Sequence, residues 1–214
     1  MELPKYPRLE TNIVEVEMDS DARSIVDLKS IDEQIKILFL AASPMDAGQI
    51  NTGSESRFKD LLKYFDEENR FTFAEEHGIS SEQFQNFLVT KDPHIVHYGG
   101  HGETEGIVLE DEDLEGDVLA AILENSDNTQ IVVLNACYSL EIAKEVARHI
   151  PFVIGTQDAI DDSTATAFAR GFYTGLVAGK SVDKAFKNGL INIRRKKLPD
   201  EDVLVLVKGI QNLS

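Results

Sequence analysis

Apolar runs alternate with amphipathic segments along most of this chain. Residues 35–42 (IKILFLAA), 131–134 (IVVL) and 152–154 (FVI) are almost continuously apolar, which is typical of strands buried on both faces of a parallel sheet. Strands separated by helices of about 10 to 15 residues predict a three-layer α/β/α sandwich with a mostly parallel central sheet. Further strands are expected at 71–74, 94–98 and 203–207, a hairpin at 106–109, and helices at 56–69, 81–88, 118–123, 140–149, 163–177 and 182–194.

The first 34 residues are patterned differently from the rest. Residues 13–18 alternate between apolar and polar, and the polar stretch after them is compatible with a helix. A chain of 214 residues is long enough for one core of roughly 200 residues. We therefore predict that residues 1–34 form an extension packed on a single domain, residues 35–214.

The balance of charge excludes several classes of partner. The chain has 21 Lys and Arg against 38 Asp and Glu, a net charge of −17 that disfavours direct binding to nucleic acid or to an anionic membrane surface. No apolar run approaches the ~18 residues of a membrane span. One cysteine allows no internal disulfide, and residues 1–10 lack a secretory pattern, so a cytoplasmic location is expected.

Two predicted strands end in residues that carry chemistry. Residues 94–98 run into Gly99-Gly100-His101-Gly102, and residues 131–134 run into Asn135-Ala136-Cys137. Functional loops of such sheets follow the carboxyl ends of the central strands. His101 could act as a base for the Cys137 thiol, with the start of the helix near Leu140 favouring the thiolate. The backbone N–H groups of Gly102 and Cys137 are candidates for an oxyanion hole.

Simpler interpretations compete with this one. A lone cysteine after a buried strand is more often a small core residue, and His94 and His97 are rival histidines inside the strand. The 36-residue separation of His101 and Cys137 nevertheless fits adjacent parallel strands joined by a crossover. The three histidines do not form a metal cluster, and neither a metal nor another cofactor is expected. A phosphatase loop would need Arg where Ala143 stands, and the glycines of GGHGETEG precede a hairpin rather than a nucleotide-binding helix.

The segments HYGGHG and VVLNACYS resemble the CHAT branch of the caspase-like cysteine peptidases. The resemblance continues in ILFLAASP and in FVIGTQDAIDDSTATAFARGFYTGLVAGKSVDKAF, and it covers about residues 35–207. It implies a caspase-like fold, Cys137 as nucleophile, His101 as general base, and the Gly102 and Cys137 amides at the oxyanion. It also implies a regulated cysteine endopeptidase in bacterial stress or antiphage defence.

The same resemblance suggests where a protein or peptide substrate would bind. Caspase-like peptidases that cut after Arg or Lys use carboxylates in the S1 pocket, and residues 155–160, including Gln157, resemble the edge on which the substrate lies as an added strand. The candidates for this carboxylate are Asp46, Asp158, Asp161 and Asp162. Asp162 could equally be a helix N-cap. Residues 103–117 hold eight acidic residues and no basic one, either as a solvated hairpin and helix start or as a negative rim for basic peptides.

Regulation and assembly are expected to involve further chains. CHAT proteins usually carry helical repeats upstream, and residues 1–34 are too few for a repeat array, so a separate regulatory or activating chain is expected. The last strand, residues 203–207, would expose an apolar edge and could form a homodimer. The basic stretch 180–197 is either a solvated helix or a docking surface. The alternative to an enzyme is a catalytically silent caspase-like module that binds a partner by edge-strand addition.

Overall fold

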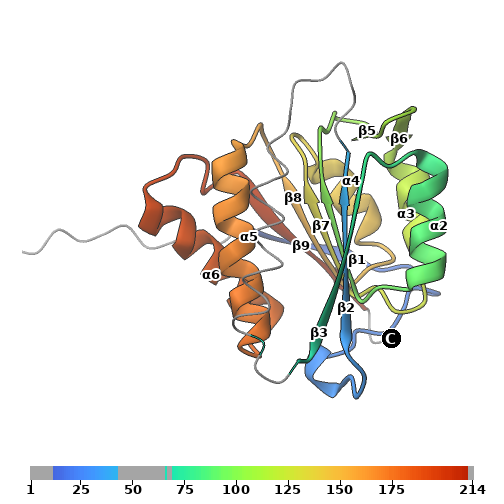
Figure 1. Ribbon diagram of the computed structural model, residues 1–214, viewed down its shortest axis with the longest axis horizontal. Helices are drawn as coiled ribbons and strands as arrows, with labels where there is room; N and C mark the ends of the chain where they lie inside the picture. Colours follow the sequence, from blue (N-terminus) through green and yellow to red (C-terminus); the bar gives the residue numbers. More distant parts are fainter. Residues whose placement is uncertain (1–11, 43–65, 67–68, 212–214) are drawn as a thin grey trace, which may run out of the picture.

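The computed structural model describes residues 12–42, 66 and 69–211, which form a seven-stranded sheet with helices on both faces (Figure 1). The strand order is β1-β9-β8-β7-β4-β2-β3, and every neighbouring pair is parallel except β8 and β9. The strands are β1 (Ile13–Glu17), β2 (Ile35–Ala41), β3 (Phe71–His77), β4 (Ile95–Gly99), β7 (Ile131–Asn135), β8 (Phe152–Thr156) and β9 (Leu204–Ile210). The predicted three-layer sandwich with a mostly parallel sheet is confirmed.

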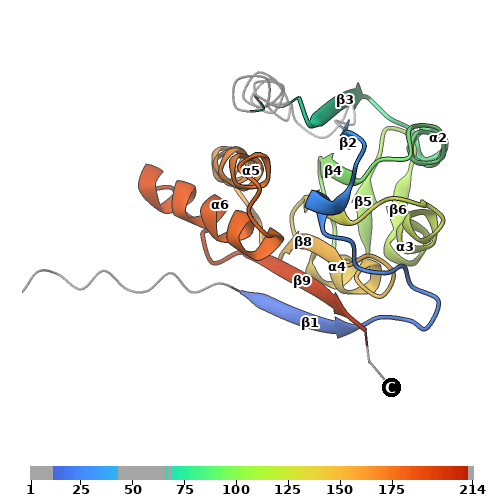
Figure 2. The ribbon, with the colours of Figure 1, turned by 90° about the horizontal axis from the view of Figure 1, so that it is seen from below.

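The helices divide into two layers, as Figure 2 shows from below. One face of the sheet is covered by α2 (Ser81–Lys91), α3 (Gly116–Glu124) and α4 (Leu140–Val146), and the other by α5 (Asp162–Val177) and α6 (Val182–Lys196). A hairpin of β5 (Gly106–Val108) and β6 (Asp113–Glu115) lies beside α2 and α3, and a short 3-10 helix, η1 (Leu28–Ser30), precedes β2.

Each helical layer encloses its own apolar core. The first core joins Leu38 and Leu40 of β2 to residues such as Phe84, Leu119 and Val146 of the three helices. The second joins the opposite faces of the same strands to α5 and α6, with Phe168, Phe172 and Phe186 among its largest members. Alternate residues of a strand point to opposite faces, so a continuously apolar strand such as β2 supplies both cores at once.

One detail of the expected helices differs from the structure, and one expected helix is not tested by it. The apolar residues of the helix expected at 118–123 predict one buried face with Val118, Leu119, Ile122 and Leu123. Leu119 and Leu123 of α3 are buried as expected, but Val118 is 45% exposed. The helix expected at residues 56–69 lies mainly outside the described residues.

The edge beside β9 is covered rather than exposed. The alternating stretch 13–18 supplies β1, which pairs in parallel with β9 from Ile13 opposite Leu206 to Glu17 opposite Ile210. The expectation that residues 203–207 offer a free apolar edge for a homodimer is therefore wrong, because the backbone groups of that edge are already bonded. None of the helices in the described part of the chain is both long and apolar enough to cross a membrane.

Candidate active site

Strand register brings the His101 loop and the Cys137 turn side by side. β4 and β7 are neighbours, with Gly99 opposite Asn135, so His101 and Cys137 each lie two residues beyond the same point of the ladder. The Gly100 N–H donates to the Asn135 carbonyl oxygen at 3.3 Å, which continues the pairing past the strands. Because both strands are parallel, both residues emerge at the carboxyl edge of the sheet, at the top of Figure 1.

Gly102 packs directly against the backbone of the cysteine turn. A Cβ atom built on Gly102 would lie 2.6 Å from the Cys137 carbonyl oxygen and 2.7 Å from the Ala136 Cβ, closer than real Cβ atoms come. The absence of a side chain is thus what lets the two loops touch. His101 directly precedes Gly102 in the chain, so the backbones that carry His101 and Cys137 meet at one junction.

Tyr98 holds the His101 loop from below. Its side chain is fully buried, and its hydroxyl reaches the carbonyl oxygens of Val108 at 2.6 Å and His101 at 3.0 Å. The Val108 N–H also donates to the His101 carbonyl oxygen at 3.1 Å. Burial raises the pKa of Tyr98, so its hydroxyl keeps the proton that these bonds require. The β5–β6 hairpin and the His101 loop therefore form one hydrogen-bonded unit.

The cysteine turn is anchored to β8 through two buried hydroxyls. Ser139 accepts from the Thr156 N–H at 3.0 Å through Oγ, and the Thr156 hydroxyl donates to the Ala136 carbonyl oxygen at 2.6 Å. Helix α4 begins at Leu140, three residues after Cys137. These bonds fix the backbone on both sides of Cys137, whose side chain is half-buried like that of His101.

The two backbone amides expected at the oxyanion are available. Within the described residues, neither the Gly102 N–H nor the Cys137 N–H donates a hydrogen bond. Unpaired backbone donors at a half-buried junction suit a developing negative charge. This arrangement can support attack by a thiolate on a carbonyl carbon.

The rival histidines lie in the core, away from the cysteine turn. His97 is fully buried against Phe39 and Tyr173, and its Nδ1 lies 3.1 Å from the Tyr173 hydroxyl. His94 accepts from the Lys36 N–H at 3.0 Å through Nδ1. Burial lowers the pKa of both, that of His97 to about 3, so both are neutral structural residues at neutral pH.

Buried His97 makes stability dependent on pH. Its pKa is about 3 in the folded chain and ~6.5 when unfolded, so the unfolded chain binds more protons between these values. Stability is fully present above pH ~6.5 and falls as pH decreases toward 3, by on the order of 1 kcal/mol per pH unit. We expect His97→Gln to flatten the dependence of unfolding free energy on pH, measured by urea titration from pH 8 to pH 4. An unchanged slope would contradict this assignment.

Removing the Tyr98 hydroxyl tests whether its hydrogen bonds position the His101 loop. We expect Tyr98→Phe to lose about 1–2 kcal/mol of stability and at least ~10-fold in peptide cleavage, since the carbonyls of Val108 and His101 lose the one hydroxyl donor that they share. Tyr173→Phe is the matched control, because its hydroxyl is equally buried but bonds His97 on the other face of the sheet. Equal losses of activity in both variants would show that Tyr98 contributes only as a buried core residue and does not position the His101 loop.

The substrate-binding candidates fall into different environments. Asp158 lies next to the cysteine turn, since its carbonyl oxygen accepts from the Tyr138 N–H at 3.4 Å and its carboxylate raises the pKa of Tyr138. Asp161 is the N-cap of α5, and its bonds to Ser163 lower the pKa of its carboxyl. Asp162 is the first residue of α5, so its predicted role as N-cap is wrong. Asp46 lies outside the described residues.

The proposed substrate edge at residues 155–160 is only partly free. Gly155 and Thr156 belong to β8, where they pair with Val205 and Leu204 of β9, so they are not an edge. The Gln157 N–H donates to Val203, and its side chain donates to the Asp202 carbonyl oxygen at 3.0 Å. Only the exposed segment after Gln157 leaves the sheet near the cysteine turn.

Tyr138 was missed by the sequence analysis. It follows Cys137 with a φ of 58°, a left-handed conformation that is uncommon for a residue other than glycine, and its ring is 46% exposed. No local pattern predicts this conformation, which occurs where the Tyr138 N–H donates to the Asp158 carbonyl oxygen and the flanking Ala136 and Ser139 are bonded to Thr156. In the described ranges, no group of three or more His, Cys, Asp or Glu side chains could hold a metal ion.

The family model of the CHAT domain matches residues 14–203, so this chain belongs to the CHAT domain family. The match begins at residue 14, within the predicted extension of residues 1–34. A protein of Gillisia limnaea named a probable protease is 23% identical over 199 residues, which cover 81% of this chain and 35% of that protein.

Solved caspase-like cysteine proteases share the fold. Gingipain R, an Arg-specific cysteine proteinase, superposes with a TM-score of 0.62 at 12% identity, over 81% of this chain and 46% of that one. Caspase-1 of Spodoptera frugiperda gives 0.54 at 12% identity over the whole of both chains. A secreted C11 cysteine protease of Bacteroides thetaiotaomicron gives 0.53 at 13% identity, over 76% of this chain and 59% of that one. The chain thus spans less than half of the curated relative and of gingipain R.

Proposed function

We propose that this chain is a cysteine endopeptidase with Cys137 as nucleophile and His101 as general base. The observation that carries the proposal is the contact of the Gly102 backbone with the Cys137 backbone at the carboxyl edge of two paired strands. Membership of the CHAT family and the fold shared with cysteine proteases support it.

The proposed reaction has two halves. His101 accepts the thiol proton while Cys137 Sγ attacks the scissile carbonyl carbon, and the oxyanion is bound by the Gly102 and Cys137 N–H groups. The C–N bond then breaks, and His101 returns the proton to the leaving amine. Water attacks the thioester with His101 as base, which releases the carboxylic acid and restores the thiol.

We further propose that Asp158 favours a basic residue before the cleaved bond. It is exposed, lies beside the cysteine turn, and is not committed to capping a helix as Asp161 is. Its carboxylate accepts from the Ala159 N–H at 2.7 Å and raises the pKa of Tyr138, and both of these neighbours are neutral groups that leave it without a cationic partner before an Arg or Lys side chain binds. Arg specificity in gingipain R, which has the same fold, is consistent with this preference.

Fluorogenic peptides with Arg, Lys or uncharged residues at P1 test the proposal directly. The purified chain is expected to cleave the basic peptides, and stoichiometric labelling of Cys137 by iodoacetamide is expected to stop cleavage. A reactive Cys137 without cleavage of these peptides would require an activating chain. An unreactive Cys137 without cleavage would instead favour the silent module that binds a partner. Regulation, a defence role and a cytoplasmic location remain predictions from the sequence.

A further inference from the structure

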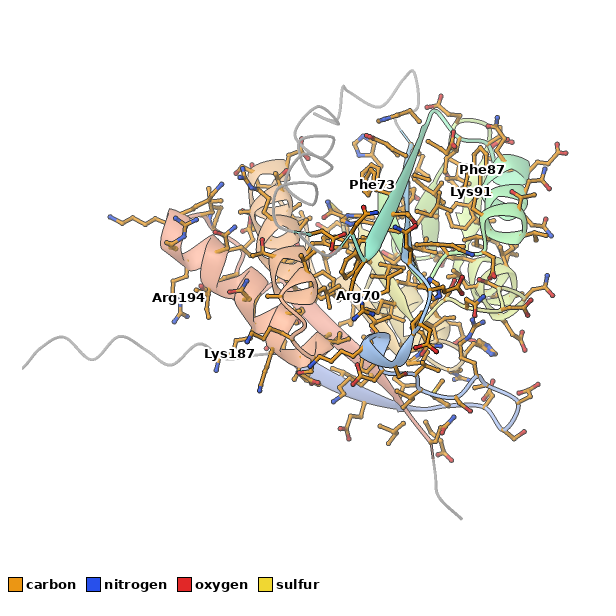
Figure 3. All side chains as sticks on the ribbon, turned by 60° about the horizontal axis from the view of Figure 1, so that its bottom comes forward. Arg70, Phe73, Phe87, Lys91, Lys187 and Arg194 are labelled. Carbon is orange, nitrogen blue, oxygen red and sulfur yellow. The ribbon has the colours of Figure 1, made fainter. Side chains whose placement is uncertain are left out.

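A cavity of about 750 Å³ lies at the edge of the sheet opposite the candidate active site. Its walls come from residues 25–29, from the first residues of β2, β3, β7 and β8, and from the turn between α5 and α6. Arg70, labelled in Figure 3 at the start of β3, marks its position beside η1. We name it the amino-edge cavity, because these parallel strands begin there whereas His101 and Cys137 follow their ends.

The inner wall of the amino-edge cavity is apolar. Ile35, Ile131 and Leu176 are buried members of the second core, and the half-buried Phe71 and Phe152 pack against the same core. The volume falls within the ~300–1,000 Å³ typical of small-molecule sites, which combine apolar walls with a few placed polar groups. An apolar body would therefore be accommodated on this wall.

The mouth of the cavity carries positive charge without a partner. Lys29 extends from η1 across the α5–α6 turn, where a Cβ on Gly179 would lie 3.5 Å from its Cε, and Lys180 follows on that turn. Neither lysine forms an ion pair with any described residue. The nearby Asp183 carboxylate is already paired with Lys208 at 3.0 Å.

The same turn begins α6, a helix of 15 residues. Its N-cap Ser181 makes no side-chain hydrogen bond to the first turn, so the first N–H groups of α6 have no side-chain cap, and Ser181, Val182 and Asp183 at this end of the helix line the cavity. The end of α5 is closed, because the Gly179 and Lys180 N–H groups donate to Leu176 and Gly175. Two acidic residues also line the mouth: Asp183, in the first turn of α6, is the one paired with Lys208, and Asp27 accepts from the Lys29 N–H at 3.0 Å. Beside them, the uncapped start of α6 and two lysines without an ion pair favour an anion at this point.

We propose that the amino-edge cavity binds an amphipathic organic anion. Its carboxylate or phosphate group lies at the start of α6 between Lys29 and Lys180, and its apolar body lies along the wall formed by Ile131 and Phe152. An inorganic anion would leave the apolar wall uncovered, and a neutral apolar molecule would leave both lysines without a counter-ion.

Isothermal titration calorimetry of the full chain tests this proposal with decanoate and decyl phosphate at concentrations below micelle formation. The expected dissociation constant is on the order of 10–100 μM. Lys180→Glu and, independently, Lys29→Glu are expected to weaken binding at least ~10-fold, since each reverses a charge at the mouth. Lys187→Glu is the matched control, because Lys187 is an exposed lysine of α6 outside the cavity (Figure 3). Thermal unfolding of every variant first establishes that it is folded.

Four outcomes would overturn the proposal. These are no binding of either probe, equal binding of decyltrimethylammonium, equal binding of inorganic phosphate, and equal weakening by Lys187→Glu. Binding of decanoate but not decyl phosphate, or the reverse, would support it and identify the head group. Peptide cleavage is not measured, so the result is independent of the proposed peptidase activity.

Discussion

Replacing Cys137 by alanine is expected to reduce kcat/KM for peptide cleavage by at least ~10⁴-fold, because no other group can form the thioester. Replacing His101 by alanine is expected to cost ~10²–10⁴-fold, the usual contribution of a general base. In the His101 variant the alkylation of Cys137 by iodoacetamide should also slow near neutral pH, since the thiol loses its proton acceptor. Both side chains are half-buried at a loop junction, so both variants should fold.

His149→Gln is the control for the loss of a histidine. His149 lies between α4 and β8, at the edge of the sheet opposite the candidate active site, near Asp19 and Glu124. Its replacement should therefore leave cleavage unchanged. If His101→Ala keeps activity within tenfold of the unmodified chain, another group is the base. Cleavage by the Cys137→Ala variant at the rate of the unmodified chain would reject the thiol mechanism.

Gly102→Ala is expected to lower kcat/KM by ~10²–10³-fold, although it adds only one methyl group. The new Cβ would meet the Cys137 carbonyl oxygen at 2.6 Å, and backbone cannot retreat as a flexible side chain can. The loops must separate, and a misplacement of ~1 Å or the loss of one oxyanion donor each costs about this much. The overpacking should also cost ~1–3 kcal/mol of stability.

Gly116→Ala provides the matched control for this substitution. Gly116 begins α3, next to the β5–β6 hairpin. The nearest neighbour of a Cβ atom at this position would be Ile142 at 3.4 Å, an ordinary contact. We expect this variant to keep full activity and to be at least as stable, since alanine suits a helix better than glycine. The measurements are kcat/KM on the cleaved peptide and urea unfolding. An active Gly102→Ala protein would show that the loops need not touch.

Much of the fold was predictable because burial leaves a local trace in the sequence. Strands β2, β7 and β8 are apolar on both faces, and this marks them as central strands of a covered sheet before any partner is known. The helices between them repeat their apolar residues at helical spacing, with Val118 as the exception. The positions of His101 and Cys137, just after two such strands, followed from the same reasoning.

The sequence by itself determined which segments are strands, which are helices, and which loops hold the imidazole and the only thiol, because periodicity and composition are local properties. The tertiary structure alone decided what those segments meet. It placed β1 on the edge of β9, closed Tyr98 over two carbonyls of the His101 loop, turned Tyr138 toward Asp158, and enclosed the amino-edge cavity between η1 and α6. Such contacts join residues far apart in the chain, and their energies depend on strand order and register, which no single segment encodes.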